Sequence, residues 1–296
     1  MLVKMKEIVD CASKENYGVA APNIFSELDA RAFLEAAEEL KSPIILDIGG
    51  KGCKDMFFLG HMVRQLAKDA KVPVAINLDH GGPLSEIYRA IQAGFTSVMV
   101  DRSTLPFDEN VRQVKEVVEI AHSIGLSVEA ELGHVGSAEQ YDVDRNAALT
   151  SVEDAVKFIE MTGVDCLAVA VGTAHGIYPK GFKPYLDFER LAEIKKATGN
   201  FPLVLHGSSG TDNESLSKAC SMGINKINVC GELCQAACEA VQAADFSGNK
   251  AYSIYDVARD AAKTKLIEKM RVYGSEGKAW FAEPHGIIAV DSNLFG

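Results

Sequence analysis

The stretch VPVAINLDHGGPLSEIYRAIQAGFTSVMVD, residues 72–101, indicates the fold most clearly. An apolar run over residues 72–78 is followed by an amphipathic segment over residues 84–93, and a second apolar run covers residues 97–101. Continuous apolar runs are typical of parallel strands buried on both faces, and a period near 3.6 between them indicates a connecting helix. The stretch therefore predicts one strand–helix–strand unit of an α/β protein.

The same alternation continues along the chain, and no linker interrupts it. Eight such units match the (β/α)8 TIM barrel in number and size. Two extra helical segments are expected at the C-terminus, over residues 254–273 and in the region after Lys278. The expected strands cover residues 17–21, 43–48, 72–78, 97–101, 127–132, 166–171, 202–205 and 224–229, and the expected helices cover residues 27–40, 55–70, 84–93, 109–123, 152–161, 188–197, 213–222 and 232–244.

A doubly wound open sheet would also alternate strands and helices. However, no GxGxxG follows the first expected strand and no GxxxxGK[ST] occurs, so the glycine-rich nucleotide loops of such folds are missing. We therefore predict a single TIM-barrel domain over residues 1–296, with its functional residues at the carboxyl ends of the strands.

The composition is that of an ordinary globular protein, with 296 residues of which 47% are hydrophobic and 24% are charged. Because 30 basic and 41 acidic residues give a formal net charge of −11, we expect neither a nucleic-acid partner nor an anionic membrane partner. A small anionic substrate is compatible with this charge, since one pocket can be positive on a negative protein.

The N-terminal sequence MLVKMKEIVD lacks the apolar core of a secretory signal, and runs such as CLAVAV are too short to span a bilayer. Seven cysteines without a CxxC pair fit reduced thiols better than a disulfide framework, so we expect a cytoplasmic protein. Cys230, Cys234 and Cys238 recur every four residues. Packing of these small thiols between helix and sheet is favoured over a structural metal site.

Three histidines lie where expected strands end: His80 in NLDHG, His175 in VAVGTAHG and His206 in LVLHGSSG. The ends of barrel strands open onto one mouth, so these imidazoles are expected to converge. Three neutral imidazoles with room for an oxygen ligand form the ligand set of a catalytic zinc centre. His134, just past the fifth expected strand, is a competing ligand. The remaining histidines, expected at the surface or in packing, are His61, His122 and His285.

Acidic residues accompany this cluster, with Asp79 next to His80, Asp101 at the end of the fourth strand and Glu131 near the end of the fifth. Adjacent residues on a strand point to opposite faces, so Asp79 and His80 share a site only if the strand breaks there, as the following Gly-Gly pair allows. A partly desolvated carboxyl beside a divalent cation can act as general acid or base. Alternatively, Asp101 and Glu131 orient the histidines or bind a metal at another position.

Two glycine-containing loops, residues 206–210 (HGSSG) and 228–231 (NVCG), follow the seventh and eighth expected strands and precede helices. Barrels commonly bind phosphate at this place, because glycine lets backbone N–H groups approach an anion and a helix N-terminus adds about half a positive charge. Turn formation alone would explain either loop. Both together, beside the expected metal, favour a phosphorylated substrate.

The motifs resemble those of the class II, zinc-dependent ketose-bisphosphate aldolases, which include fructose- and tagatose-bisphosphate aldolases. The resemblance implies reversible cleavage of a ketose 1-phosphate or 1,6-bisphosphate to dihydroxyacetone phosphate and an aldehyde, by a homodimer or homotetramer. It covers nearly the whole chain and is carried, in order, by NLDHG, VMVDRS, EAELGHVG, VAVGTAHGIY, LDFERL, PLVLHGSSG, INKINV and IEKMRVYGSEGKA.

The resemblance also implies roles for individual residues. Asp79 would donate a proton to the aldehyde-derived oxygen, and Glu139, on a lid over residues 133–147, would abstract a proton. Zinc would be held by His80, His175 and His206, with Asp101 and Glu131 at a second metal position, and a monovalent cation, Na⁺ or K⁺, would lie near the phosphate. The implied substrate-binding residues are Asn23, Gly176, Gly207, Ser208, Ser209, Asn228, Val229, Cys230 and Gly231.

Four positions depart from the family pattern. The family usually has HGGSG or HGASG where this chain has HGSSG, and a threonine where Gly231 stands. A serine of bisphosphate enzymes corresponds to Gly49, and an arginine of one bacterial branch aligns loosely with Tyr252. The last two changes concern the aldehyde half of the substrate. An aldolase for a 6-sulfo or deoxy sugar phosphate is therefore an alternative.

Three other functions compete with this interpretation. A Schiff-base aldolase needs an inward-pointing lysine, for which Lys226, in the same strand parity as Asn228, is the candidate. Barrel hydrolases that use zinc usually carry an HxH pair on the first strand, and none is present. A non-catalytic sugar-phosphate-binding subunit would keep the fold, but here all candidate chemical residues are present.

Overall fold

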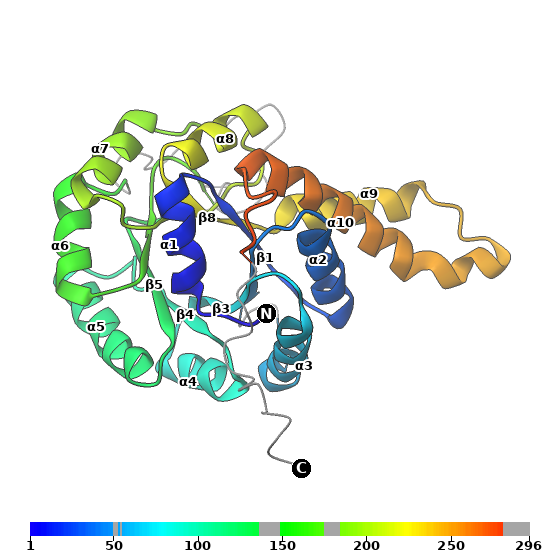
Figure 1. Cartoon of the computed structure of the whole chain (residues 1–296), viewed down its shortest axis with the longest axis horizontal. Helices are drawn as coiled ribbons and strands as arrows, with labels where there is room; N and C mark the ends of the chain where they lie inside the picture. The colour runs from blue at the N-terminus through cyan, green and yellow to red at the C-terminus, as the bar shows by residue number, and fades with distance from the viewer. Residues whose placement is uncertain (50–52, 54, 136–148, 175–183, 281–296) are drawn as a thin grey trace, which may run out of the picture.

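The computed structural model describes residues 1–49, 53, 55–135, 149–174 and 184–280. Within these residues, eight parallel strands form one sheet in the order β1-β8-β7-β6-β5-β4-β3-β2. A bridge between Asn23 and Asp47 joins the two ends of this order, so the sheet is a nearly closed barrel. Helices alternate with the strands and surround them (Figure 1), which confirms the predicted TIM barrel.

Each of the eight predicted strands and each of the eight predicted barrel helices has a counterpart, with bounds that differ by a few residues. The strands are β1 (Val19–Pro22), β2 (Ile44–Gly49), β3 (Val74–Gly81), β4 (Ser97–Val100), β5 (Ser127–Leu132), β6 (Cys166–Val169), β7 (Leu203–Leu205) and β8 (Ile224–Val229). The helices are α1 (Met5–Glu15), α2 (Glu27–Glu39), α3 (Met56–Asp69), α4 (Leu84–Ala93), α5 (Phe107–Ser123), α6 (Val152–Thr162), α7 (Phe188–Thr198), α8 (Asn213–Ser221), α9 (Gly231–Ala243) and α10 (Ile254–Tyr273), with a short 3₁₀ helix η2 (Gly248–Ser253) before α10.

Short polar side chains determine where several helices begin on the loops at the barrel's mouth. Each accepts a hydrogen bond from a backbone N–H group in the first helical turn, which satisfies a donor that has no partner within the helix. These capping residues are Ser26 for α2, Asp55 for α3, Ser151 for α6, Asp187 for α7 and Asp212 for α8.

Helix α1, which precedes the first strand, closes the opposite end of the barrel and was not predicted. Its apolar face, with Met5, Ile8 and Val9 fully buried, packs into the same cluster as small residues of the strands such as Ala75 and Ala168. Figure 1 shows α1 lying across the barrel. The small residues of the strands leave room for this helix, so the interior is dry at this end and polar at the other.

Helices α9 and α10 form an arm that extends beyond the ring of helices (Figure 1). Tyr252, Ile254 and Tyr255, where η2 meets α10, are exposed large side chains on this arm. The helix predicted over residues 254–273 is present as α10, whereas most of the region after Lys278 lies outside the described residues. None of the helices in the described part of the chain is both long and apolar enough to cross a membrane.

We predict that Ile8→Ala lowers the free energy of unfolding by about 2–5 kcal/mol, because it leaves a cavity where α1 plugs the barrel. The measurement is chemical denaturation of the purified protein. Lys14→Ala, on the exposed side of the same helix, is the matched control and should change the free energy by less than about 0.5 kcal/mol. Equal effects of the two substitutions would mean that α1 does not seal the barrel.

Candidate functional site

A group of polar side chains lies where the strands end and lines a cavity of about 990 Å³. The ends of β3, β4 and β5 contribute Asp79, His80, Asp101 and Glu131 to its lining. The predicted position of the site, at the carboxyl ends of the strands, agrees with this cavity. Other described lining residues come from α3 and α4 and from the loops after β1, β2, β5 and β8.

A break in β3 brings two consecutive side chains to the same side. The pairing of β3 with β4 shifts between Leu78 and Gly81, and His80 has a positive φ of 51°. A left-handed backbone at a residue other than glycine costs about 1–3 kcal/mol and is concentrated at functional sites. A Cβ atom on Gly81 would lie 2.4 Å from the carbonyl oxygen of Met99, so glycine is required there. This local geometry is the predicted break that lets Asp79 and His80 share one site.

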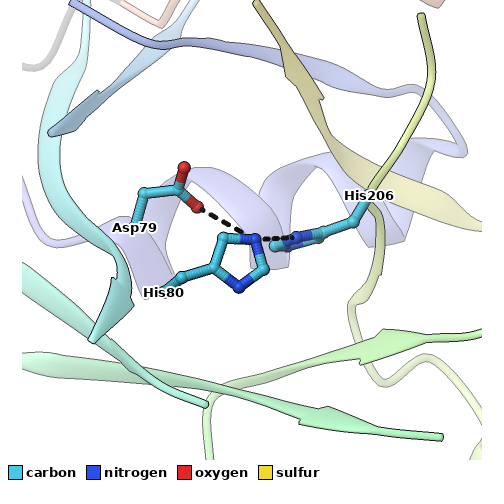
Figure 2. Close-up of side chains that lie close together, drawn as sticks. All are labelled: Asp79, His80 and His206. Atoms are coloured by element: carbon cyan, nitrogen blue, oxygen red, sulfur yellow. Dashed lines mark hydrogen bonds and ion pairs between the residues drawn. The ribbon is translucent and has the colours of Figure 1, made fainter. Parts of the chain in front are cut away.

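The imidazole rings of His80 and His206 meet at the centre of the site, with one nitrogen of each ring directed toward the other (Figure 2). The Nε2 atom of His80 lies 3.0 Å from the Nδ1 atom of His206 and 3.8 Å from a carboxylate oxygen of Asp79. The other ring nitrogens contact carboxylates, His80 Nδ1 with Asp101 at 2.9 Å and His206 Nε2 with Glu129 at 2.9 Å. A carboxylate behind an imidazole is the usual arrangement for a metal-binding histidine.

This arrangement fits a cation between the rings. If His80 donates to Asp101 and His206 donates to Glu129, the two facing nitrogens both present lone pairs, which repel each other at 3.0 Å unless a positive charge lies between them. Two nitrogens bound to one tetrahedral zinc ion lie about 3.3 Å apart, which is close to the observed separation. His80, His206 and Asp79 accordingly form one group able to hold a metal ion.

Glu131 forms a second such group with His80 and Asp101. Its side chain is 1% exposed, and its Oε2 atom has no hydrogen-bond partner among the described residues. Burial and the nearby Asp101 raise the pKa of Glu131 to about 8, although His80 opposes this shift. A buried carboxylate oxygen without a donor also fits a metal ligand, so the predicted second metal position has the residues that it needs.

Both oxygens of Asp79 are held by amide groups. Asn23 donates to Oδ2 at 2.8 Å, and Asn228 donates to Oδ1 at 2.9 Å. Burial raises the pKa of Asp79, but His80, His206, Lys226 and the Asn23 amide outweigh burial and keep this pKa below its ordinary value. Asp79 is therefore an ionised carboxylate, held in place and able to accept a proton.

Lys226 lies below this site in the barrel interior, and its side chain is fully buried. Its Nζ atom contacts Asp47 at 3.3 Å, Glu129 at 3.0 Å and the Asn228 side-chain oxygen at 2.5 Å. Burial lowers the pKa of Lys226, but Asp47 and Glu129 outweigh burial and hold the pKa above its ordinary value. Lys226 does point inward, as its parity indicated, but as a charged and fully engaged ammonium group.

The loops after β7 and β8 lie side by side. Ser208 donates its hydroxyl hydrogen to the carbonyl of Asn228 at 2.6 Å, which ties one loop to the other. Gly207 has a φ of 67°, and a Cβ atom there would lie 2.4 Å from the carbonyl oxygen of Ala174. The strand-6 loop thus packs directly on the strand-7 loop.

The helices that follow these loops, α8 and α9, differ in how their N-termini are capped. Asp212 caps α8, whereas no described side chain caps α9, which begins at Gly231 with Cys230 at its N-cap. Three predicted substrate-binding residues lie nearby. Val229 is the last residue of β8, Cys230 lines the cavity, and Ser209 lies on the loop after β7. The N-terminus of α9 can therefore offer its backbone N–H groups to an anion more readily than that of α8.

Several predicted residues lie outside the described part of the chain, and the structure gives no position for them. They are His175, Gly176, Glu139, His285 and the part of the predicted lid over residues 136–147. Among the other histidines, His134 is exposed beside the cavity and contacts Ser103 at 3.3 Å, and His122 pairs with Asp165 at 2.8 Å, away from the cavity lining.

Glu129 was not among the predicted site residues, and Lys226 was considered only as the nucleophile of a Schiff-base aldolase. A signal for Glu129 was present, because Glu129 and Glu131 are two residues apart on one strand and so point to the same face. Asp47, which pairs with Lys226, carried no comparable signal. Its position inside the barrel depends on how neighbouring strands are staggered.

Comparison with known proteins extends these observations. The family described as "Fructose-bisphosphate aldolase class-II" matches residues 3–278. A fructose-bisphosphate aldolase of Geobacillus stearothermophilus is 43% identical over 94% of this chain and 99% of its own. A sulfofructosephosphate aldolase of Alkalicoccus urumqiensis is 39% identical over 93% of this chain and 97% of its own.

Among solved structures, that of the YdjI aldolase from Escherichia coli K12 superimposes with a TM-score of 0.83 at 36% identity, covering 95% of this chain and all of the other. The family match spans the barrel, the predicted motifs and the polar site at the ends of the strands. On this evidence the chain is a member of the class II fructose-bisphosphate aldolase family, whose enzymes are aldehyde-lyases.

Proposed function

We propose that this chain is a zinc-dependent aldolase that reversibly cleaves a ketose 1-phosphate or 1,6-bisphosphate, of the fructose or tagatose type, to dihydroxyacetone phosphate and an aldehyde. The observation that carries the proposal is the pair of imidazole nitrogens of His80 and His206, 3.0 Å apart, each ring held from behind by a carboxylate. The single domain proposed for it spans residues 1–296.

His80 and His206, together with His175, would hold the zinc ion. Bound zinc would supply Lewis-acid stabilisation of the negative charge that develops at the C2 carbonyl when the bond between C3 and C4 breaks. Asp101 and Glu129 fix the orientation of the two described imidazoles through hydrogen bonds of 2.9 Å. Asp101 and Glu131 would provide the second metal position.

Asp79 would move the proton at the C4 oxygen. In the cleavage direction its carboxylate accepts the C4 hydroxyl proton, and in the condensation direction it returns that proton to the aldehyde-derived oxygen. The hydrogen bonds from Asn23 and Asn228 hold this carboxylate in one orientation. Glu139 would exchange the proton at C3.

The phosphate of the dihydroxyacetone half would bind at the N-terminus of α9. This end of the helix has no side-chain cap among the described residues and follows directly on the loop tied to Ser208. A monovalent cation, Na⁺ or K⁺, would lie near this phosphate. The proposed binding residues are Asn23, Gly176, Gly207, Ser208, Ser209, Asn228, Val229, Cys230 and Gly231.

A second candidate substrate is a ketose 1-phosphate modified at C6, such as a 6-sulfo or deoxy sugar. Gly49 favours it, because this cavity-lining residue has no hydroxyl where bisphosphate enzymes carry a serine. One relative at 39% identity is named a sulfofructosephosphate aldolase. A non-catalytic sugar-phosphate-binding subunit is disfavoured by the engaged Asp79 carboxylate.

We further propose a cytoplasmic homodimer or homotetramer. All seven cysteines are unpaired, as in proteins of a reducing compartment. The exposed Tyr252, Ile254 and Tyr255 on the α9–α10 arm are candidates for contact with a second copy.

Removal of zinc tests the metal-dependent reaction against the Schiff-base alternative. We predict that a strong chelator abolishes cleavage, that added zinc restores it, and that borohydride with dihydroxyacetone phosphate traps no adduct at Lys226. The measurements are a coupled cleavage assay and intact-protein mass spectrometry. Chelator-resistant turnover with a borohydride adduct would replace the proposal by imine chemistry.

Single substitutions separate metal binding from proton transfer. We predict that His80→Ala loses zinc and activity together, whereas Asp79→Ala keeps zinc and loses about 10²–10⁴-fold in kcat, the usual contribution of a positioned acid or base. Zinc content by atomic emission and steady-state kinetics check this. Near-normal turnover of zinc-loaded Asp79→Ala would remove Asp79 from its role.

Gly49→Ser tests whether residue 49 contacts the C6 group in the aldehyde half of the substrate. A Cβ atom on Gly49 would make only ordinary contacts, 3.6 Å from the Asp79 carbonyl oxygen, and the fold should tolerate the serine. We predict that kcat/KM for a 1,6-bisphosphate rises about tenfold relative to that for a 1-phosphate, because one hydrogen bond to a charged group is gained. Gly49→Ala is the matched control. An unchanged ratio would show that residue 49 does not contact the C6 group.

A further inference from the structure

Arg89 is the only lysine or arginine in the described lining of the cavity that also contains the candidate metal-binding residues. It is exposed and lies on α4, which begins four residues after His80. Ser85 and Glu86 precede Arg89 by four and three residues, so each lies next to Arg89 on the helix surface, and all three line the cavity.

The direction of α4 turns Arg89 toward the mouth of the barrel. Side chains on an α-helix tilt toward its N-terminus, and the N-terminus of α4 follows the loop that ends β3. This tilt favours the side of the helix that faces the loop after β3, and Arg89 lines the same cavity as Asp79 and His80.

Three of the carboxylates that line the cavity already have hydrogen-bond partners. Asp79 accepts hydrogen bonds from two amide groups, Asp101 contacts His80, and Glu86 accepts the backbone N–H of Gly82 at 3.0 Å. Arg89, in contrast, forms no ion pair within 4.0 Å with any carboxylate that the structure describes, Glu86 included. A cation that faces a substrate cavity without such a partner can bind an anionic ligand group.

Different parts of the cavity wall suit different halves of the substrate. The N-terminus of α9, where the dihydroxyacetone phosphate is proposed to bind, follows β8, whereas α4 follows β3. Phe25, Cys53 and Met56 add apolar surface to the described lining but no charge. The charge of Arg89 is therefore available to the end of the substrate that is remote from the C1 phosphate.

We propose that Arg89 is a specificity-determining residue that binds an anionic group at the far end of the aldehyde half. The inference rests on the proposed aldolase function and narrows its substrate to aldehydes that end in an oxyanion. Phosphate, sulfonate and carboxylate groups share this chemistry, because each presents two oxygens to the fork of a guanidinium group. The absence of a serine at position 49 then matters less, because Arg89 would recognise the C6 end of the substrate instead.

The test is condensation of dihydroxyacetone phosphate by the zinc-loaded protein with four three-carbon aldehydes. Three end in phosphate, sulfonate or carboxylate, and the fourth is neutral glyceraldehyde. We expect Arg89→Gln to lower kcat/KM about 10- to 100-fold for the preferred anionic aldehyde and less than about threefold for glyceraldehyde. Arg89→Lys, which keeps the charge but not the fork, should recover part of the loss.

Arg64→Gln is the matched control, because Arg64 lies on α3 beside Gly94 and does not line the cavity. It should leave all four rates unchanged. The aldehyde with the largest Arg89-dependent loss identifies the oxyanion. Equal losses for charged and neutral aldehydes in Arg89→Gln, or no loss for any, would overturn the inference while leaving the aldolase function intact.

A binding measurement keeps the inference testable if no aldehyde reacts, the outcome that would overturn the proposed function. Glycerol 3-phosphate, which cannot condense, is titrated calorimetrically into the protein with dihydroxyacetone phosphate in excess. We expect about 10- to 100-fold weaker binding to Arg89→Gln and unchanged binding to Arg64→Gln. Equal affinity in all three proteins would show that Arg89 recognises no anion.

Discussion

The rest of the site depends on the contacts of the Lys226 ammonium group, which is fully buried inside the barrel. It contacts the carboxylates of Asp47 and Glu129, and its neighbours connect it to both His206 and Asp79. Glu129 holds the His206 ring, while Asn228, bound to the same ammonium group, holds Asp79. Buried ion pairs add little net stability, but the loss of one partner leaves a costly unpaired charge, so such a network fixes geometry.

The barrel interior has two layers, a polar one at the strand ends that line the cavity and an apolar one around α1. At one end α1 fills the interior with apolar side chains, and at the other the strand ends carry charges and glycines. Because water is excluded from below, hydrogen bonds in the polar layer are stronger than they would be in solvent. At the mouth, the loops after β7 and β8 form one part of the wall, where we propose that a phosphate binds, and α4 forms another.

Much of this organisation could be predicted from sequence, because alternating apolar runs and helical periods report burial directly. The eight strands, the convergence of His80 and His206, and the break after Asp79 followed from the motifs and their spacing. Helix α1 was not predicted, because the N-terminal segment was considered only as a possible secretory signal and its amphipathic pattern was not used. Asp47 and Lys226 could not be paired, because the pairing depends on strand stagger, and Arg89 stood out only once α4 was oriented over the cavity.

The left-handed backbone of His80 has an evolutionary consequence. A residue forced into this conformation lowers the stability of the folded chain, and asparagine or glycine would adopt it with less strain. Replacing His80 by one of these residues would therefore relieve strain and raise thermal tolerance at the cost of an imidazole in the candidate metal site. A strained histidine at this position is expected where the side chain is needed for binding or catalysis more than for stability.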